Sequence, residues 1–241
     1  MQKALHPEGD AVCHIIVLHP PGGIAGGDEL ELRVHVGGNA HGLLATPGAG
    51  KWYRSAGARA RQRVCFTLES DACLEWLPQE TIVFDGALAA MTTAIHLADR
   101  ARYIGWEITC LGRTGSGERF THGTARMQTR IDGPRGPVFI ERGELAGGAA
   151  LLESAAGLGA QPVFGTLLAA AETVDKSLLT ACREVQPVDG AGTVTWLPNV
   201  LVARYLGPST QAARHYFIAL WKILRPALLG RDAVEPRIWS T

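Results

Sequence analysis

The chain has 241 residues, and its 23 basic and 23 acidic residues balance, so its formal net charge is zero. A chain without a cluster of Lys and Arg lacks the electrostatic footprint of a nucleic-acid-binding protein. No apolar run is long enough to span a membrane, and the N-terminus does not resemble a signal peptide. The five cysteines are scattered without CxxC spacing, which indicates reduced thiols. We therefore expect a cytoplasmic protein that binds neither nucleic acid nor a membrane.

Strand-like patterns follow one another along most of the chain. The clearest lies at 29–36, where apolar and polar residues alternate strictly, as in a strand with one buried face. No strand alternates with a helix at the spacing of a βαβ unit, so residues 1–145 are predicted to be all-β. The predicted strands lie at 12–19, 29–36, 59–68, 73–77, 81–84, 92–98, 102–111, 120–131, 137–145, 165–171 and 194–206.

Two helices are predicted toward the C-terminus. Asp175 is a candidate N-cap for a short helix over 176–184. A longer helix is predicted after Ser209, because apolar residues recur there at helical spacing, with Pro226 and Gly230 as stop signals. No exact repeat or linker divides the chain. We therefore expect a single domain over residues 1–241, with an all-β body followed by a mixed part at 146–241.

Several familiar functional motifs are incomplete in this sequence. Residues 48–51 read GAGK, but the first glycine and the hydroxyl residue of a phosphate-binding loop are missing. The glycines at 22–27 precede a strand instead of a helix, which excludes a dinucleotide-binding loop. Ser55 has no nucleophile-elbow motif around it, and the eight histidines lack HxxxH or HxH spacing. A closed metal site is therefore not expected, whereas a weak or transient one stays open.

Four carboxylates interrupt apolar strands or follow a glycine-rich turn: Asp28, Glu75, Glu107 and Glu141. An ionised carboxylate in such surroundings costs several kcal/mol unless it is paired, hydrated or bound to a cation. One interpretation is a buried ion pair, with candidate partners Arg102, Arg126 and Arg142. The other is a hydrated internal path whose oxygen ligands hold a divalent cation weakly enough to release it.

Several distinct motifs occur over almost the whole chain in a characteristic order. The longest reads HPPGGIAGGD at 19–28. The others lie at 7–10, 13–14, 46–55, 74–80, 112–113, 117–123, 221–226 and 236–239. In this order they resemble the motifs of the UreD family of urease accessory proteins, called UreH in some bacteria.

The resemblance implies a mainly β fold, with β-helix-like stacked strands in one domain and two helices toward the C-terminus. It also implies no enzyme activity and no tightly bound cofactor. Such a protein would be a scaffold that docks on apo-urease and recruits UreF and, through it, the GTPase UreG. Transient Ni(II) would then reach the urease active site through an internal acid-lined tunnel. Carried over by position, the acids of this path are Asp28, Glu107 and Glu141.

The chain departs from the family pattern at its beginning. Relatives usually have a further stretch, including a strand, ahead of the motif at 7–10, which this sequence lacks; either its start is misassigned or this N-terminal strand region is missing. We expect its loss to leave an exposed sheet edge or an opened tunnel wall.

Two segments are candidate partner surfaces. Lys51, Tyr53 and Arg54 lie in a turn flanked by glycines, and protein interfaces favour aromatic residues and Arg. The aromatic side of the C-terminal helix, with Tyr216 and Trp221, is the second candidate, although packing against the β body is the role expected for at least half of its aromatic residues.

Two other functions are weighed against nickel delivery. A purely structural adaptor would open urease without conducting nickel, so its acids would have no effect on nickel loading. A hydrolase would use Asp28 or His122 as a base, but the sequence offers only isolated residues for this chemistry.

Overall fold

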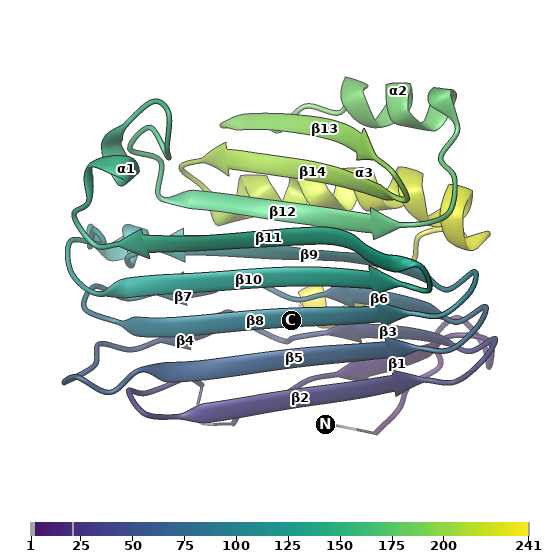
Figure 1. Cartoon of the computed structure of the whole chain (residues 1–241), viewed down its shortest axis with the longest axis horizontal. Helices are drawn as coiled ribbons and strands as arrows, with labels where there is room; N and C mark the ends of the chain where they lie inside the picture. Colours follow the sequence, from purple (N-terminus) through teal and green to yellow (C-terminus); the bar gives the residue numbers. More distant parts are fainter. Residues whose placement is uncertain (1–2, 21, 241) are drawn as a thin grey trace.

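A computed structural model describes residues 3–20 and 22–240 of the chain, so Pro21 of the longest motif lies outside the described residues. The described residues form two β-sheets, one of nine strands and one of five. The sheets face each other, and strands from successive turns of the chain stack within each of them (Figure 1). This arrangement is a β-solenoid, which confirms the predicted fold class.

The five-stranded sheet has the order β11-β10-β8-β5-β2. Its first four strands in the chain pair in parallel, and β11 pairs antiparallel with β10. Parallel pairing needs no helix here, because the chain crosses to the opposite sheet between consecutive strands. The strands are β2 (Glu29–Val36), β5 (Ala60–Leu68), β8 (Leu88–Leu97), β10 (Thr124–Gly133) and β11 (Gly136–Ala146).

The nine-stranded sheet follows the order β1-β3-β6-β9-β12-β14-β13, while β7 pairs with both β4 and β9. It extends beyond β11, the last strand of the five-stranded sheet, through β12, β14 and β13 (Figure 1). These strands are β1 (Cys13–Ile16), β3 (His41–Ala45), β4 (Gly50–Trp52), β6 (Cys73–Leu77), β7 (Thr81–Val83), β9 (Arg102–Leu111), β12 (Val163–Ala170), β13 (Ala191–Leu197) and β14 (Val200–Gly207).

Most predicted strands are present, and those at 29–36, 73–77 and 102–111 have the predicted bounds. The single strand predicted at 194–206 is wrong: it is the hairpin of β13 and β14, which turns at Asn199 with a φ of 66°. Asparagine tolerates this left-handed conformation better than most residues. The sequence prediction missed β3 and β4, because both are short and follow glycine-rich segments.

The two C-terminal helices are confirmed as α2 (Lys176–Glu184) and α3 (Thr210–Leu229). The side chain of Asp175 caps α2, and that of Ser209 caps α3. Pro226 does not stop α3, since it lies inside the helix and the loss of one N–H donor is tolerated; Gly230 ends the helix with a φ of 67°. The shorter helices are η1 (Thr114–Ser116), α1 (Ala150–Glu153) and η2 (Arg237–Ser240).

The core has a layer between the two sheets and a layer between the nine-stranded sheet and α3. Phe66 of β5 and Trp76 of β6 meet in the first layer, with ring centroids 5.6 Å apart. Phe217 and Leu220 of α3 are fully buried in the second layer. Helix α3 lies behind the nine-stranded sheet in Figure 1, so it packs on the outer face of that sheet and not in the space between the two sheets.

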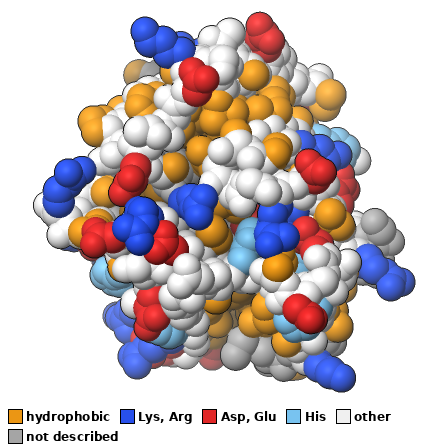
Figure 2. Space-filling model, turned by 90° about the vertical axis from the view of Figure 1, so that its right-hand side faces the viewer, with side chains coloured by type: hydrophobic (Ala, Val, Ile, Leu, Met, Phe, Trp, Pro, Cys, Tyr) orange, Lys and Arg blue, Asp and Glu red, His pale blue; other side chains and the backbone are white. Residues whose placement is uncertain are grey.

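The end of the solenoid toward which β5, β8 and β10 point carries acidic and basic side chains in mixture (Figure 2). Oppositely charged residues there pair with each other: Arg100 with Asp71 in turns at 2.6 Å, and Arg130 with Asp132 in β10 at 2.7 Å. Neither sign of charge dominates this face, in keeping with the balanced composition. Among the described residues, we find no helix with the length and apolar character needed to cross a membrane.

Candidate functional site

A row of polar residues crosses the nine-stranded sheet on the side that faces the other sheet. Glu107 of β9 is paired in register with Thr166 of β12, and Thr166 is paired with Arg204 of β14. Residues opposite each other on neighbouring strands point to the same face of a sheet. The three side chains therefore form one line across three adjacent strands.

The five-stranded sheet carries a matching row. Thr93 of β8 is paired with Thr129 of β10, and Thr129 is paired with Glu141 of β11. Further down the sheet the same line continues with Val64 of β5 and Leu32 of β2, so the polar part of the row ends at Thr93.

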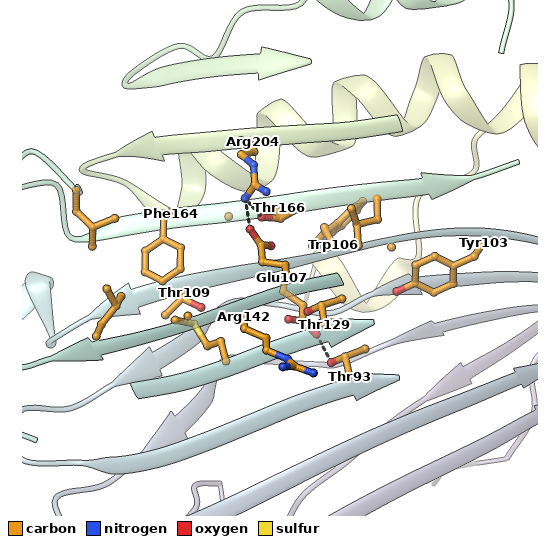
Figure 3. Close-up of a pocket in the computed structure, with 18 residues that line it drawn as sticks. Thr93, Tyr103, Trp106, Glu107, Thr109, Thr129, Arg142, Phe164, Thr166 and Arg204 are labelled. Carbon is orange, nitrogen blue, oxygen red and sulfur yellow. Dashed lines mark hydrogen bonds and ion pairs between the residues drawn. The ribbon is translucent and has the colours of Figure 1, made fainter. Parts of the chain in front are cut away.

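The two polar rows face each other and line a cavity of about 210 Å³ between the sheets (Figure 3). Apolar side chains, including Met127, Leu145 and Phe164, complete its wall. Arg204 reaches from β14 toward the acids, while Thr93 and Thr129 lie on the opposite side. The cavity therefore offers carboxylate and hydroxyl oxygens inside a largely apolar solenoid.

Glu107 is the inner acid of this cavity. Its carboxylate accepts a hydrogen bond from the hydroxyl of Thr93, and Thr129 also stabilises the charged form. Burial raises the pKa of Glu107, the bond from Thr93 opposes this rise, and the nearby Glu141 adds to it, so the pKa lies above its usual value. Within residues 3–20 and 22–240 no Lys, Arg or His forms an ion pair with Glu107. A half-buried acid that lines an internal cavity without a cationic partner is the least expected feature of this core.

Glu141 is the outer acid, and it forms an ion pair with Arg204. The Nη1 atom of Arg204 lies 2.6 Å from Oε1 of Glu141, and it also donates to the hydroxyl of Thr166 at 3.2 Å. The side chains of Glu141 and Arg204 are 36% and 46% exposed. The pair therefore marks the mouth of the cavity, where β11 ends the cover over the nine-stranded sheet.

Asp28 lies away from this cavity. It precedes β2 and is exposed, and its carboxylate accepts a hydrogen bond from the backbone N–H of Ala25 at 2.8 Å. It therefore closes the loop at the end of the glycine-rich motif. Of the three acids assigned to a nickel path, the structure brings together Glu107 and Glu141 but not Asp28.

Glu75 forms a buried ion pair, which is one of the two interpretations given above for the four carboxylates. It is fully buried, and both of its oxygens accept from Nε of Arg225, at 3.0 and 3.1 Å. Trp221 donates to it at 2.5 Å, and the Nε2 atom of His41 lies 2.8 Å away. The partner, Arg225 of α3, is not among the arginines considered from the sequence, because 150 residues separate it from Glu75.

Of the segment predicted as a turn, Lys51 lies in strand β4, and Tyr53 and Arg54 directly follow the strand; all three residues are exposed. Tyr53 is 37% exposed, and its ring packs edge-on against Phe84 at a centroid distance of 5.2 Å. Nη2 of Arg54 lies 3.4 Å from a carboxylate oxygen of Asp85. An aromatic ring and a guanidinium held at the surface by neighbours are typical of a protein-docking patch.

Tyr216 and Trp221 do not offer such a surface, because they are only 2% and 0% exposed. Both belong to the core between α3 and the nine-stranded sheet. The aromatic side of α3 faces the sheet, so both residues pack in the core and do not form a partner surface.

His122 is held by a turn. The Asp85 carboxylate accepts from the backbone N–H groups of Thr121 and His122, each at 2.7 Å, and Nδ1 of His122 lies 3.2 Å from it. Desolvation opposes ionisation of Asp85, but these hydrogen bonds outweigh it and lower its pKa to about 2. Asp85 therefore anchors the turn, and Asp28, the other residue considered for hydrolysis, closes a different loop.

The fold and the cavity define a class of protein: a β-solenoid scaffold with an internal, acid-lined cavity. Residues 1–240 match the family model described as UreD urease accessory protein. The chain belongs to this family, whose members are non-catalytic accessory proteins of urease maturation.

Relatives from several bacteria are similar to the chain over its full length. The urease accessory protein UreD of Azoarcus sp. (strain BH72) is 53% identical over 241 residues, which cover 85% of that protein. The UreD protein of Dechloromonas aromatica (strain RCB) is 55% identical over 245 residues, again covering 85% of the relative. That of Nitrosococcus oceani is 51% identical over 241 residues, and 81% of it is covered.

The residues that sequence reasoning missed are Arg204, Thr93, Thr129 and Thr166. They come from strands far apart in the chain, and strand register alone brings them together. A threonine in a strand is so common that no pattern in the sequence distinguishes these three.

Proposed function

We propose that this chain is a scaffold that docks on apo-urease, recruits UreF and through it UreG, and passes Ni(II) through the cavity between its sheets. The observation that supports the nickel path most strongly is Glu107, a half-buried acid that faces a second acid across a cavity and forms no ion pair among the described residues. If the solenoid served only as a docking surface, an apolar residue in place of Glu107 would make the fold more stable.

The chemistry of the cavity suits a cargo ion that is held and then released. Glu107 and Glu141 supply carboxylate oxygens, and Thr93, Thr129 and Thr166 supply hydroxyl oxygens. Among the described residues no cluster of three or more His, Cys, Asp or Glu side chains could hold a metal ion. Two carboxylates and water bind a divalent cation weakly compared with sites of more numerous protein ligands. Weak binding is what a transfer path needs.

The partner surface is proposed at Lys51 of β4 and at Tyr53 and Arg54, which directly follow that strand; all three are exposed. Asp28 is also exposed, so any contact it makes with nickel would be at the surface and outside the cavity. We place this function in the cytoplasm, in keeping with the five free cysteines.

The nickel path is tested by changing Glu107→Gln and Glu141→Gln together. Both substitutions keep the side-chain volume and remove the charges that attract a cation. We expect the complex with UreF, UreG and apo-urease to assemble at the wild-type level, with nickel loading of urease lowered roughly tenfold. The measurement is co-expression, capture on this chain, and determination of nickel per urease active site.

Glu144→Gln is the matched control, because Glu144 lies on the same strand, pairs with Arg126 at 3.0 Å and is about half exposed. It removes one negative charge outside the cavity and should leave nickel loading unchanged. Normal loading in the double variant would instead support the purely structural adaptor.

A further inference from the structure

We propose that Arg204 is a positioning residue that acts as a tethered cation at the mouth of the cavity. It occupies Glu141 between nickel passages, and an arriving divalent cation must displace it. This inference rests on the proposed nickel path and names a device that regulates it.

The geometry places Arg204 between the two acids and solvent. Its guanidinium contacts Glu141 at 2.6 Å and the Thr166 hydroxyl at 3.2 Å. Thr166 is the register partner of both Arg204 and Glu107, so it is the link in the row between the mouth and the inner acid. A cation that binds between Glu141 and Glu107 therefore competes with Arg204 for the carboxylate of Glu141.

The exposure of the pair makes displacement feasible. Because Arg204 and Glu141 are each more than a third exposed, water screens their attraction and can solvate either group after separation. A fully buried pair would resist separation, as leaving one charge unpaired in the core is costly. After separation, the guanidinium has room to move, because β14 lies beyond β11, the last strand of the five-stranded sheet (Figure 1).

Arg204 also explains how the cavity avoids retaining its cargo. Two carboxylates that faced each other without a competing charge would attract a divalent cation more strongly. When the ion leaves, the guanidinium of Arg204 returns to Glu141, and its positive charge opposes rebinding of the ion. The arginine thus lowers the affinity of the mouth for nickel and favours release in either direction.

The test compares Ni(II) binding to the whole purified chain by equilibrium dialysis. Arg204→Gln should bind Ni(II) roughly ten- to hundredfold more tightly than the wild type, because both the competing ion pair and the repulsion of the cation are removed. Arg204→Lys keeps the positive charge and should stay close to the wild-type affinity. Adding Glu141→Gln to Arg204→Gln should abolish the gain in affinity.

Arg142 offers a matched control, since it also lines the cavity and forms no ion pair among the described residues. Arg142→Gln changes the net charge equally and should tighten binding far less than Arg204→Gln. Equal tightening in the two variants, an unchanged affinity in Arg204→Gln, or a gain that survives Glu141→Gln would each overturn the proposal. Thermal unfolding of every variant verifies the fold.

The failure of this inference differs from the failure of the nickel path. If Glu107→Gln with Glu141→Gln lowers nickel loading while Arg204→Gln binds Ni(II) like the wild type, the path stands and the role of Arg204 is rejected. If the acid variant loads urease normally, the path itself fails, and with it the role of Arg204.

Discussion

Replacing Arg225 with methionine is expected to lower the free energy of unfolding by about 3–5 kcal/mol, the usual result of removing one partner from a buried ion pair. Arg225 of α3 is fully buried, and its two Nη atoms each lie 2.8 Å from an oxygen of Glu8. Its Nε atom bonds Glu75 of β6. Methionine fills a similar volume but leaves two carboxylates in the core without their cation.

The arginine connects segments that are far apart in the chain, since 217 residues separate it from Glu8. Nε2 of His14 also lies 2.6 Å from Glu8. Loss of Arg225 should therefore loosen the attachment of the N-terminal segment to α3 as well as destabilise the core. Urea unfolding measures the stability, and amide hydrogen exchange in β1 and α3 measures the loosening.

The control is Arg61→Met, which removes an arginine from an exposed pair with Glu29 whose side chains are 54% and 72% exposed. Its expected cost is below about 1 kcal/mol. If Arg225→Met were no more destabilising than Arg61→Met, the buried cluster would not be important for stability.

The cluster also predicts a dependence of stability on pH. Burial by itself raises the pKa of Glu8, but hydrogen bonds from Arg225 and His14 outweigh burial and hold the pKa below its usual value. A group with a lowered folded-state pKa stabilises the protein fully above its unfolded pKa of about 4.3. This stabilisation is lost as the pH falls through the folded-state pKa. The loss should be smaller in Arg225→Met, where the main cause of the lowered pKa is absent.

Changing Tyr53→Ala and Arg54→Ala together is expected to weaken capture of the accessory-protein complex at least a hundredfold. Central aromatic and arginine residues of an interface typically contribute about 2 kcal/mol or more each. Tyr53 packs on Phe84, and Arg54 pairs with Asp85, so both side chains are held in place before a partner arrives. Less ordering entropy is then lost on binding. Co-purification and titration of the partners against the immobilised chain provide the measurement.

Val188→Ala is the control for exposed apolar surface, because Val188 is 83% exposed and belongs to none of the core clusters. It should leave capture unchanged. Wild-type affinity in the Tyr53 and Arg54 variant would place the docking surface elsewhere. A wild-type unfolding midpoint in both variants excludes misfolding as the cause.

The sequence anticipated local features well. The alternation at 29–36 indicated a strand with one buried face, and Asp175 and Ser209 marked the starts of two helices. These signals lie within a few residues of the structure they determine. Pro226 misled the prediction because the packing of α3 outweighs the loss of one backbone hydrogen bond.

The partners of the acids could not be predicted from the sequence. It marked Glu75, Glu107 and Glu141 as costly to bury, but it could not tell which would be paired. The structure gives Glu75 a buried arginine from α3, Glu141 a half-exposed arginine from β14, and Glu107 a threonine. The partners differ because strand register and helix packing bring them from distant parts of the chain.

Local signals in the sequence account for the β-rich character of the chain, its two C-terminal helices and its family motifs, because periodicity, capping residues and turns act over short distances. Long-range strand pairing, in contrast, places Glu107, Thr166 and Arg204 in one row that faces Thr93, Thr129 and Glu141. A shift of one residue in any strand would turn its member of the row to the opposite face. The cavity therefore depends on the pairing of all six strands, which no local pattern encodes.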